Sequence, residues 1–299
     1  MTESLRTKIY IDGFNFFYGC LKGTPYKWLD LHKLFINNII PSVQIDPKKN
    51  VQPEWHLVEK GVCLYTADII ESISDVESVK AQKTYHNALK KLYPNTVNII
   101  KGYYSKTRAK AYLVEEGKQP LDSEQVTIWK LEEKKSDVNL AIDAYHDVAT
   151  DSVDMVVIVT NDTDVERCLE KIKELNRDTI IGLVSPNENI NPNQSLKEHA
   201  DWVYKRITRQ SLQEYQLPNI VVGGRRPSRK PVMWYETPKL VEKVLELGKQ
   251  VLKTEGKVWK YLNTPNSKYF NGSAPIDLLN TEAGCQEIIS YMEKYIDEN

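Results

Sequence analysis

The sequence predicts an α/β fold in which a mainly parallel sheet is flanked by helices and is followed by a small all-helical domain. Two observations carry this prediction. Short apolar runs alternate with longer stretches of helical periodicity, and the composition changes after residue 218. Strands that alternate with helices form right-handed βαβ units, whose strands run parallel. A length of 299 residues accommodates one large domain or two unequal ones.

Short apolar runs define the expected strands. The run at residues 9–11 stops at Asp12-Gly13, a pair typical of a turn. Residues 155–159 form the most strongly apolar run, which is typical of a central strand buried on both faces. The expected strands are residues 9–11, 61–66, 97–104, 125–131, 155–159, 179–184 and 202–204.

Helices are expected where apolar residues recur every three or four positions. Pro41 and Pro94 follow two of these stretches and end them, since proline does not continue a helix. The expected helices are residues 15–20, 29–40, 76–92, 137–149 and 165–175, with further helical turns between 195 and 213 around the last strand.

A segment at residues 219–237, rich in glycine, proline and arginine, predicts an exposed linker between residues 1–218 and residues 238–299. Beyond it, Pro275 is placed to start a helix and Thr281 to cap the next one. The sequence therefore predicts a separate helical domain over residues 238–299.

The net charge, the cysteine spacing and the apolar runs of the sequence limit which classes of function are compatible with it. The formal net charge of −1 excludes bulk electrostatic attraction to nucleic acid, so binding of this kind needs local basic patches. The four cysteines lack the spacing of a zinc site, which predicts reduced core thiols. No signal peptide precedes the first strand and no apolar run is long enough to span a bilayer, so we expect a cytoplasmic protein.

Four aspartates are expected at one edge of the sheet. Asp12 follows the first strand, Asp162 and Asp164 follow the strand at 155–159, and Asp137 begins a helix near the same edge. Parallel sheets bind ligands outside the carboxyl ends of their strands. Crowded carboxylates raise one another's pKa, and a hard divalent cation such as Mg²⁺ relieves this repulsion. A bound cation then activates water for phosphodiester hydrolysis.

A purely structural interpretation of these aspartates stays open. An aspartate after a strand commonly caps a helix or forms a turn, as Asp12 could. Asp164 could favour the positive end of a helix dipole. Ser136 competes with Asp137 as the cap of the following helix.

Three motifs resemble the NYN domain, the LabA-like branch of the PIN-like nucleases. They are Tyr10-Ile-Asp-Gly-Phe-Asn15, Glu132-Glu-Lys-Lys-Ser-Asp-Val-Asn-Leu-Ala141 and Val159-Thr-Asn-Asp-Thr-Asp164, and the resemblance extends over residues 6–218. It implies a Rossmann-like PIN core, Mg²⁺ or Mn²⁺ held by the four aspartates, and single-stranded or structured RNA as substrate. This chain has Lys135 and Thr160-Asn161 where the family often has glycine and Ser-Gly or Ser-Asn.

Several polar residues are expected to support this site. In the resemblance, Asn15 matches the asparagine of the first motif, and Asn139 and Asn161 are candidates for the surrounding shell. Lys106, Arg108 and Lys110 occupy alternate positions in a segment flanked by tyrosines, so they would share one face of a strand. Such cations can bind the phosphates of a nucleic acid, and the tyrosine rings can stack on its unpaired bases. A charged edge that prevents aggregation is the alternative. Lys135 could contact phosphate or be solvated.

Residues 257–295 resemble the toxin-binding domain of the MbcA/ParS/Xre antitoxins. The segments that carry the resemblance are Lys257 to Asn266, Phe270 to Leu279, and Thr281 to Gly284 with the final helix. The resemblance implies a helical module that contacts a protein partner or a second copy; in that family it binds RES-type toxins. The helix-turn-helix region that usually accompanies it is absent from the sequence.

The sequence thus favours a metal-dependent endoribonuclease, with a toxin or a defence effector as the biological setting. The alternative is a non-catalytic scaffold that binds RNA or a toxin through the C-terminal helices. A nucleotide-binding α/β enzyme is disfavoured, because Asp12-Gly-Phe-Asn15 has one glycine and places an anion where a phosphate needs donors.

Overall fold

The computed structural model describes residues 4–298, except residues 46–51, 72–73, 188 and 267–268. The chain divides into two compact units. The first comprises Met1–Phe16, Ser42–Lys83 and Asn95–Arg206, and the second comprises Phe17–Pro41, Thr84–Pro94 and Ile207–Asn299. The contiguous domain boundaries expected at residues 218 and 238 stay a prediction.

The first unit contains a six-stranded parallel sheet in the order β3-β2-β1-β6-β7-β8. Its strands are β1 (Leu5–Asp12), β2 (Trp55–Thr66), β3 (Val97–Lys101), β6 (Met155–Val159), β7 (Ile180–Val184) and β8 (Trp202–Tyr204). Every residue of β6 is fully buried, as its apolar run predicted. The predicted α/β fold with a parallel sheet is confirmed.

The register between the two central strands brings two polar residues together. β1 and β6 pair from Thr7–Met155 to Ile11–Val159. The next residues of the two strands, Asp12 and Thr160, therefore emerge side by side at the carboxyl edge of the sheet.

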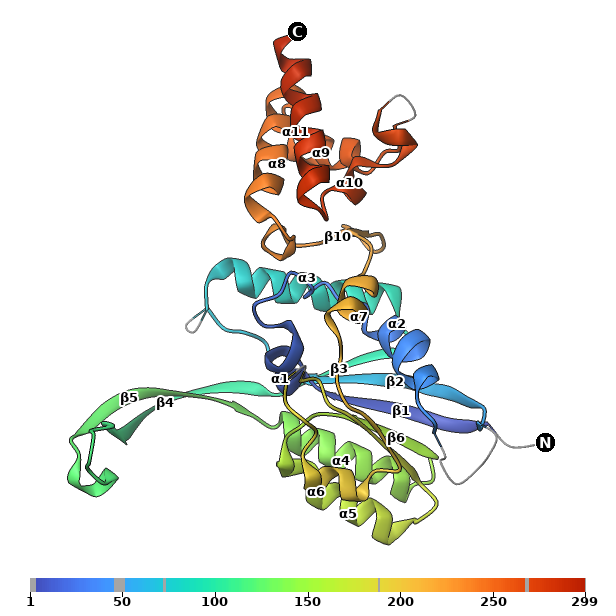
Figure 1. Ribbon diagram of the computed structural model, residues 1–299, viewed down its shortest axis with the longest axis vertical. Helices are drawn as coiled ribbons and strands as arrows, with labels where there is room; N and C mark the ends of the chain where they lie inside the picture. Colours follow the sequence, from blue (N-terminus) through green and yellow to red (C-terminus); the bar gives the residue numbers. More distant parts are fainter. Residues whose placement is uncertain (1–3, 46–51, 72–73, 188, 267–268, 299) are drawn as a thin grey trace. The chain divides into compact units, whose positions relative to one another are not determined.

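One face of the sheet is covered by α4 (Ser136–Ala149), α5 (Glu166–Leu175) and α6 (Gln194–His199) (Figure 1). Leu140, Ala144 and Val148 recur every four residues along α4 and are buried against the sheet. This spacing places them on one side of the helix. The expected helices at 137–149 and 165–175 are thus observed within one residue of their predicted starts.

The remaining helices before residue 218 are mostly short. α3 (Val76–Leu92) has the predicted bounds. The helix expected at 29–40 is instead α2 (Leu31–Lys33), a π-helical stretch (Leu34–Ile39) and a 3₁₀ turn (Ile40–Ser42). α1 (Gly13–Phe16) continues as a π-helical stretch over Phe17–Leu21, and α7 is Arg209–Glu214.

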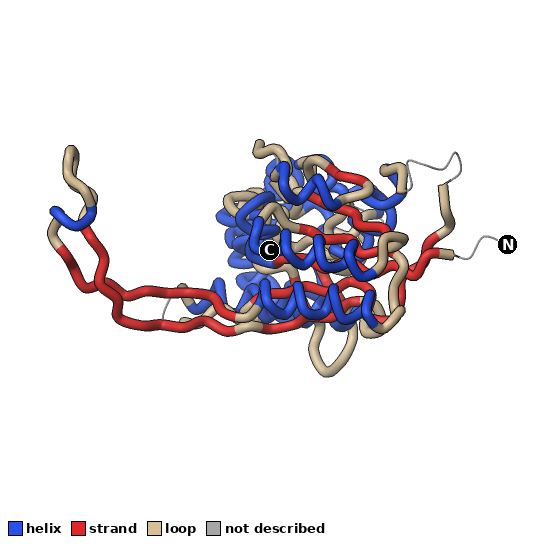
Figure 2. Tube along the Cα trace, turned by 90° about the horizontal axis from the view of Figure 1, so that it is seen from below, coloured by secondary structure: helices blue, strands red, loops and turns tan. Residues whose placement is uncertain are grey.

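A long antiparallel hairpin extends from the sheet (Figures 1 and 2). It consists of β4 (Tyr103–Tyr112) and β5 (Gln125–Lys134). The expectation of one strand over residues 97–104 is therefore wrong, because Gly102 separates β3 from β4. A Cβ atom at Gly102 would lie 2.2 Å from the carbonyl oxygen of Lys134, so only glycine allows the backbones to approach there.

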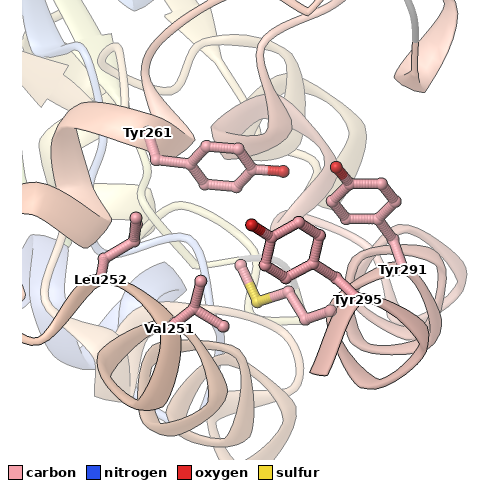
Figure 3. A pocket seen from close by; sticks show the side chains of 7 residues that line it. Val251, Leu252, Tyr261, Tyr291 and Tyr295 are labelled. Carbon is pink, nitrogen blue, oxygen red and sulfur yellow. The ribbon is translucent and has the colours of Figure 1, made fainter. Parts of the chain in front are cut away.

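The end of the second unit is a cluster of helices with its own apolar core. The helices are α8 (Pro238–Leu252), α9 (Glu255–Leu262), α10 (Pro275–Leu278) and α11 (Glu282–Asp297). The side chain of Thr281 accepts the Gly284 N–H, so the predicted cap is present. A cavity of about 200 Å³ lies between α8, α9 and α11 and is lined by Gly248, Val251, Leu252, Tyr261, Tyr291, Met292 and Tyr295 (Figure 3).

The glycine- and arginine-rich segment is less exposed than predicted. Only residues 222–227 form an exposed run. β9 (Ile220–Val221) pairs with β10 (Ser228–Arg229), and Lys230 and Trp234 beyond it are buried. This packing could not be predicted from the sequence, because the buried residues of the segment are few and lie among polar ones.

The helices and the cysteines also bear on the sequence-based expectations. Within the described residues, no helix has both the length and the apolar character needed to cross a membrane. The four cysteines are free thiols, as predicted, and three of them are buried.

Candidate active site

Asp12 is held rigidly at the end of β1. Its side chain is 4% exposed. One carboxylate oxygen accepts the backbone N–H groups of Phe14 and Asn15 at 3.1 and 2.9 Å, and the other accepts the Thr160 hydroxyl at 2.8 Å. Asp12 thus performs the capping role that the sequence left open, and the same bonds fix its carboxylate at the carboxyl edge.

Asp162 and Asp164 lie in the loop that follows β6. The Asp162 N–H donates to the Thr160 hydroxyl oxygen at 3.1 Å, and the Asp162 carboxylate caps the next turn by accepting the Asp164 N–H at 3.0 Å. Thr160 therefore joins this loop to Asp12. Thr160 was not among the predicted site residues, although the aligned ends of two apolar strands could have indicated it.

A chain of asparagines supports the same loop. The side-chain oxygen of Asn15 accepts the Asn161 N–H at 3.0 Å, and that of Asn161 accepts the Asn193 N–H at 2.7 Å. The predicted supporting position of Asn15 and Asn161 thus has a structural basis, and Asn193 extends the chain beyond what the sequence indicated. The side chain of Asn139 makes no hydrogen bond to the four aspartates among the described residues.

Asp137 lies in the first turn of α4, immediately after the hairpin. Lys135 has the positive φ of 81° and turns the chain from β5 into this helix. The Ser136 hydroxyl donates to Glu133 at 2.6 Å, so Ser136 is held by the hairpin rather than capping α4. Lys135 Nζ lies 5.1 Å from the centre of the Tyr103 ring.

The acids at this edge influence one another electrostatically. Burial raises the pKa of Asp137 to about 6, and the negative charges of Asp12, Glu133, Asp162 and Asp164 add to the rise. Burial also raises the pKa of Asp12, although its hydrogen bonds oppose the rise. Glu133 is a member of this group that the sequence-based prediction missed.

Within the described residues, none of the four predicted aspartates forms an ion pair with a lysine, arginine or histidine. In the same part of the chain, no three acidic, histidine or cysteine side chains converge as a ready-made metal centre. The donor set is nevertheless suited to a hard cation, because it consists of carboxylate oxygens whose charges are mutually unfavourable.

Asp143 lies six residues beyond Asp137 on α4 and accepts the Tyr65 hydroxyl at 2.9 Å. The three cations of β4 lie where the sequence predicted. Lys106, Arg108 and Lys110 alternate along β4 and share one face of the hairpin.

The fold and site define a parallel α/β protein with an acidic carboxyl edge. The pattern of the NYN domain matches residues 63–206, which include Asp137, Asp162 and Asp164 but not Asp12. The chain belongs to the NYN domain family.

A relative from Pseudomonas putida (strain DSM 28022 / S16) is 40% identical over 302 aligned residues, which cover 99% of this chain and 96% of that protein. It is named 6-hydroxy-3-succinoylpyridine 3-monooxygenase HspA. A crystal structure of a protein of unknown function from Vibrio parahaemolyticus is 15% identical, with a TM-score of 0.41 over 73% of this chain and 99% of that one.

Proposed function

We propose that this protein is a metal-dependent endoribonuclease whose active site is the acidic carboxyl edge. The observation that carries the proposal is a partly buried group of carboxylates. Burial and then the neighbouring negative charges raise the pKa of Asp137, and no cation among the described residues compensates. A fold gains nothing from such repulsion, because a partly buried charge without a partner is costly. Membership of the NYN domain family supports the same chemistry.

Mg²⁺ or Mn²⁺ would be held by Asp12, Asp137, Asp162 and Asp164. When bound, the cation would activate water and neutralise charge on the phosphate under attack. Hydrogen bonds within the protein hold two of these aspartates in position. Thr160 and two backbone N–H groups fix the Asp12 carboxylate, and the link from Asn15 to Asn161 fixes the loop that carries Asp162.

RNA is the proposed substrate, and four cations are candidates to bind it. Lys135 is adjacent to the first turn of α4, where Asp137 lies, so it would contact a phosphate close to the site of cleavage. Lys106, Arg108 and Lys110 lie along the hairpin and would bind the strand further away.

Monooxygenation is a second candidate, favoured by the name of the 40% identical relative. It would convert 6-hydroxy-3-succinoylpyridine with O₂ and a reductant. The local structure argues against a nucleotide cofactor at the end of β1. The N–H groups of Phe14 and Asn15, which would otherwise be available to a phosphate, are donated to the carboxylate of Asp12.

The test compares purified wild-type protein with Asp162→Asn and with Asp178→Asn, a matched change at an exposed aspartate. Each is incubated with RNA, transfer RNA and single-stranded DNA in Mg²⁺, Mn²⁺ or chelator. We expect RNA cleavage that requires metal, is lost in Asp162→Asn and persists in Asp178→Asn.

A parallel reaction contains 6-hydroxy-3-succinoylpyridine, O₂ and a nicotinamide reductant. Substrate consumption there, without RNA cleavage in any metal, would contradict the ribonuclease proposal and favour oxygenation. RNA binding by a folded protein that cleaves nothing would instead favour the non-catalytic scaffold.

A further inference from the structure

The hairpin formed by β4 and β5 presents two chemically different faces. Residues opposite each other in an antiparallel pair share a face, and successive residues alternate between faces. The register pairs Arg108 with Trp129 and Lys106 with Leu131. One side, here called the basic face, therefore carries Tyr104, Lys106, Arg108 and Lys110 from β4 and Thr127, Trp129, Leu131 and, at its base, Glu133 from β5.

The cations of the basic face have no carboxylate partner in the described part of the chain. Lys106, Arg108 and Lys110 form no ion pair among the described residues. Trp129 is 58% exposed although its ring is the largest apolar group on the hairpin. Lys106 Nζ and the Arg108 guanidinium lie 4.7 and 5.3 Å from the centre of that ring, so the cations and the indole form one surface.

The opposite face is different in charge and in size. Lys130 and Lys134 both form ion pairs with Glu132, which lies between them on the same strand. The β4 residues on that side, from Ser105 to Ala111, are small. The same hairpin thus carries cations without carboxylate partners on one face and paired cations on the other.

The basic face leads towards the acidic edge. At the base of the hairpin the Tyr104 ring packs edge-on against Phe14, with 5.8 Å between ring centres. Phe14 donates its N–H to Asp12. Along the other strand, β5 runs directly into the turn that precedes Asp137. Both strands therefore begin or end at the proposed active site.

We propose that the basic face binds a single-stranded segment of RNA and guides it to the acidic edge. Alternate residues of a strand are about 7 Å apart, so Lys106, Arg108 and Lys110 can follow successive phosphates of an extended strand. The exposed face of Trp129 stacks on an unpaired base. A duplex keeps its bases stacked within the helix and cannot use this contact. The proposal takes the identity of the substrate from the proposed ribonuclease activity, but binding needs neither metal nor cleavage.

The experiment measures the fluorescence anisotropy of a labelled single-stranded RNA without self-complementarity, in chelator and in the Asp162→Asn background. The variant Lys106→Gln/Arg108→Gln is compared with Lys130→Gln/Lys134→Gln, which removes the same charge from the opposite face. We expect the first pair to weaken binding roughly tenfold and to reduce the slope of log K against log salt by about 1.4, since each phosphate contact contributes about 0.7. The second pair should bind almost as tightly as the parent.

Trp129→Thr tests the stacking contact. We expect it to weaken binding of the single strand roughly tenfold while leaving the salt slope unchanged, and to leave the weaker binding of the annealed duplex unaffected. Circular dichroism and thermal melting of each variant establish that the fold is retained.

Equal losses from the two charge pairs would overturn the proposal, because they would indicate non-specific attraction. Undiminished binding in the basic-face variants would also overturn it. A change in oligomeric state on size-exclusion chromatography, with unchanged RNA binding, would assign the hairpin to a contact with a second copy of the chain instead. None of these results depends on whether the protein cleaves RNA, so the two proposals fail separately.

Discussion

Aspartates at the two edges of the parallel sheet differ in whether a lysine or arginine forms an ion pair with them. At the amino end, Arg6 binds Asp151 and Asp154 at 2.8 and 2.7 Å, and Lys8 binds Asp147 at 2.6 Å. At the carboxyl end, Asp12 and its neighbours have no cationic partner among the described residues. The first arrangement stabilises the fold, whereas the second is costly until something positive binds.

The pKa values of aspartates at the two edges shift in opposite directions. Hydrogen bonds from Arg6 lower the pKa of Asp154, while burial and like charges raise the pKa of Asp137 to about 6. Sequence alone does not separate these aspartates, because both lie near the ends of helices or strands. The difference lies in which charges the fold places beside each one.

The largest effect is expected for Asp137→Asn. RNA cleavage in Mg²⁺ should fall at least a hundredfold, since a group that stabilises charge in the reaction commonly contributes that much. Stability in chelator should rise, because the raised pKa shows that the folded state disfavours the charged carboxylate. Solvent screening of this partly exposed side chain limits the gain to about 1 kcal/mol.

The gain from Asp137→Asn has a defined pH dependence. The variant's gain over the wild type should appear as the pH rises from about 4 to about 6, the interval between the ordinary pKa and the raised one, because the wild-type carboxyl group ionises there at a cost to the folded state. Urea denaturation of both proteins across that interval measures it. A variant that is less stable than the wild type at pH 7 in chelator would contradict the account.

The next effect is expected at the amino end, for Asp147→Ala. Its carboxylate accepts from Lys8 and from the Tyr10 hydroxyl at 2.7 Å, and both partners would lose their acceptor in a largely buried place. We expect a loss of about 3 kcal/mol in the free energy of unfolding. The double variant Lys8→Met/Asp147→Ala should recover much of it. Cleavage by the folded protein should be unchanged, and a loss of cleavage without a loss of stability would reverse the roles of the two edges.

A smaller effect is expected for Asp154→Asn. Its contacts with Arg6 are partly exposed, so the loss in the free energy of unfolding at pH 7 should be about 1 kcal/mol. Because the folded-state pKa of Asp154 is lowered, this contribution is fully present above the ordinary pKa of about 4 and declines as the pH falls from there through the lowered folded-state pKa. Thermal melting should therefore show a larger difference between variant and wild type at pH 7 than at pH 3.

Much of the fold was predictable because its core strands and helices are strongly patterned. β6 and α3 have the predicted bounds, and the register of β1 on β6 follows from two apolar runs that end at polar residues. The hairpin was not predictable in full, because its exposed strands alternate lysine with alanine and bury almost nothing. The contact through Gly102 that separates it from β3 depends on residues far apart in the sequence.

The candidate site was predictable in its acids but not in its connections. Asp12, Asp137, Asp162 and Asp164 stand out because each lies where a strand or hairpin ends. Thr160 and Glu133 do not stand out in the sequence, because only the fold brings them to their partners. Thr160 binds the Asp12 carboxylate, and Glu133 binds the Ser136 hydroxyl. The roles of all these residues in catalysis stay a prediction.

Direct titration of Mn²⁺ into the protein tests whether the carboxylates at the carboxyl edge form a cation site. Isothermal titration calorimetry should compare the wild type with Asp137→Asn and with Asp154→Asn, which make the same change at opposite edges of one sheet. We expect the wild type and Asp154→Asn to bind Mn²⁺ alike, and Asp137→Asn to bind it at least tenfold more weakly. Equal binding by all three proteins, or no binding by the folded wild type, would contradict this expectation.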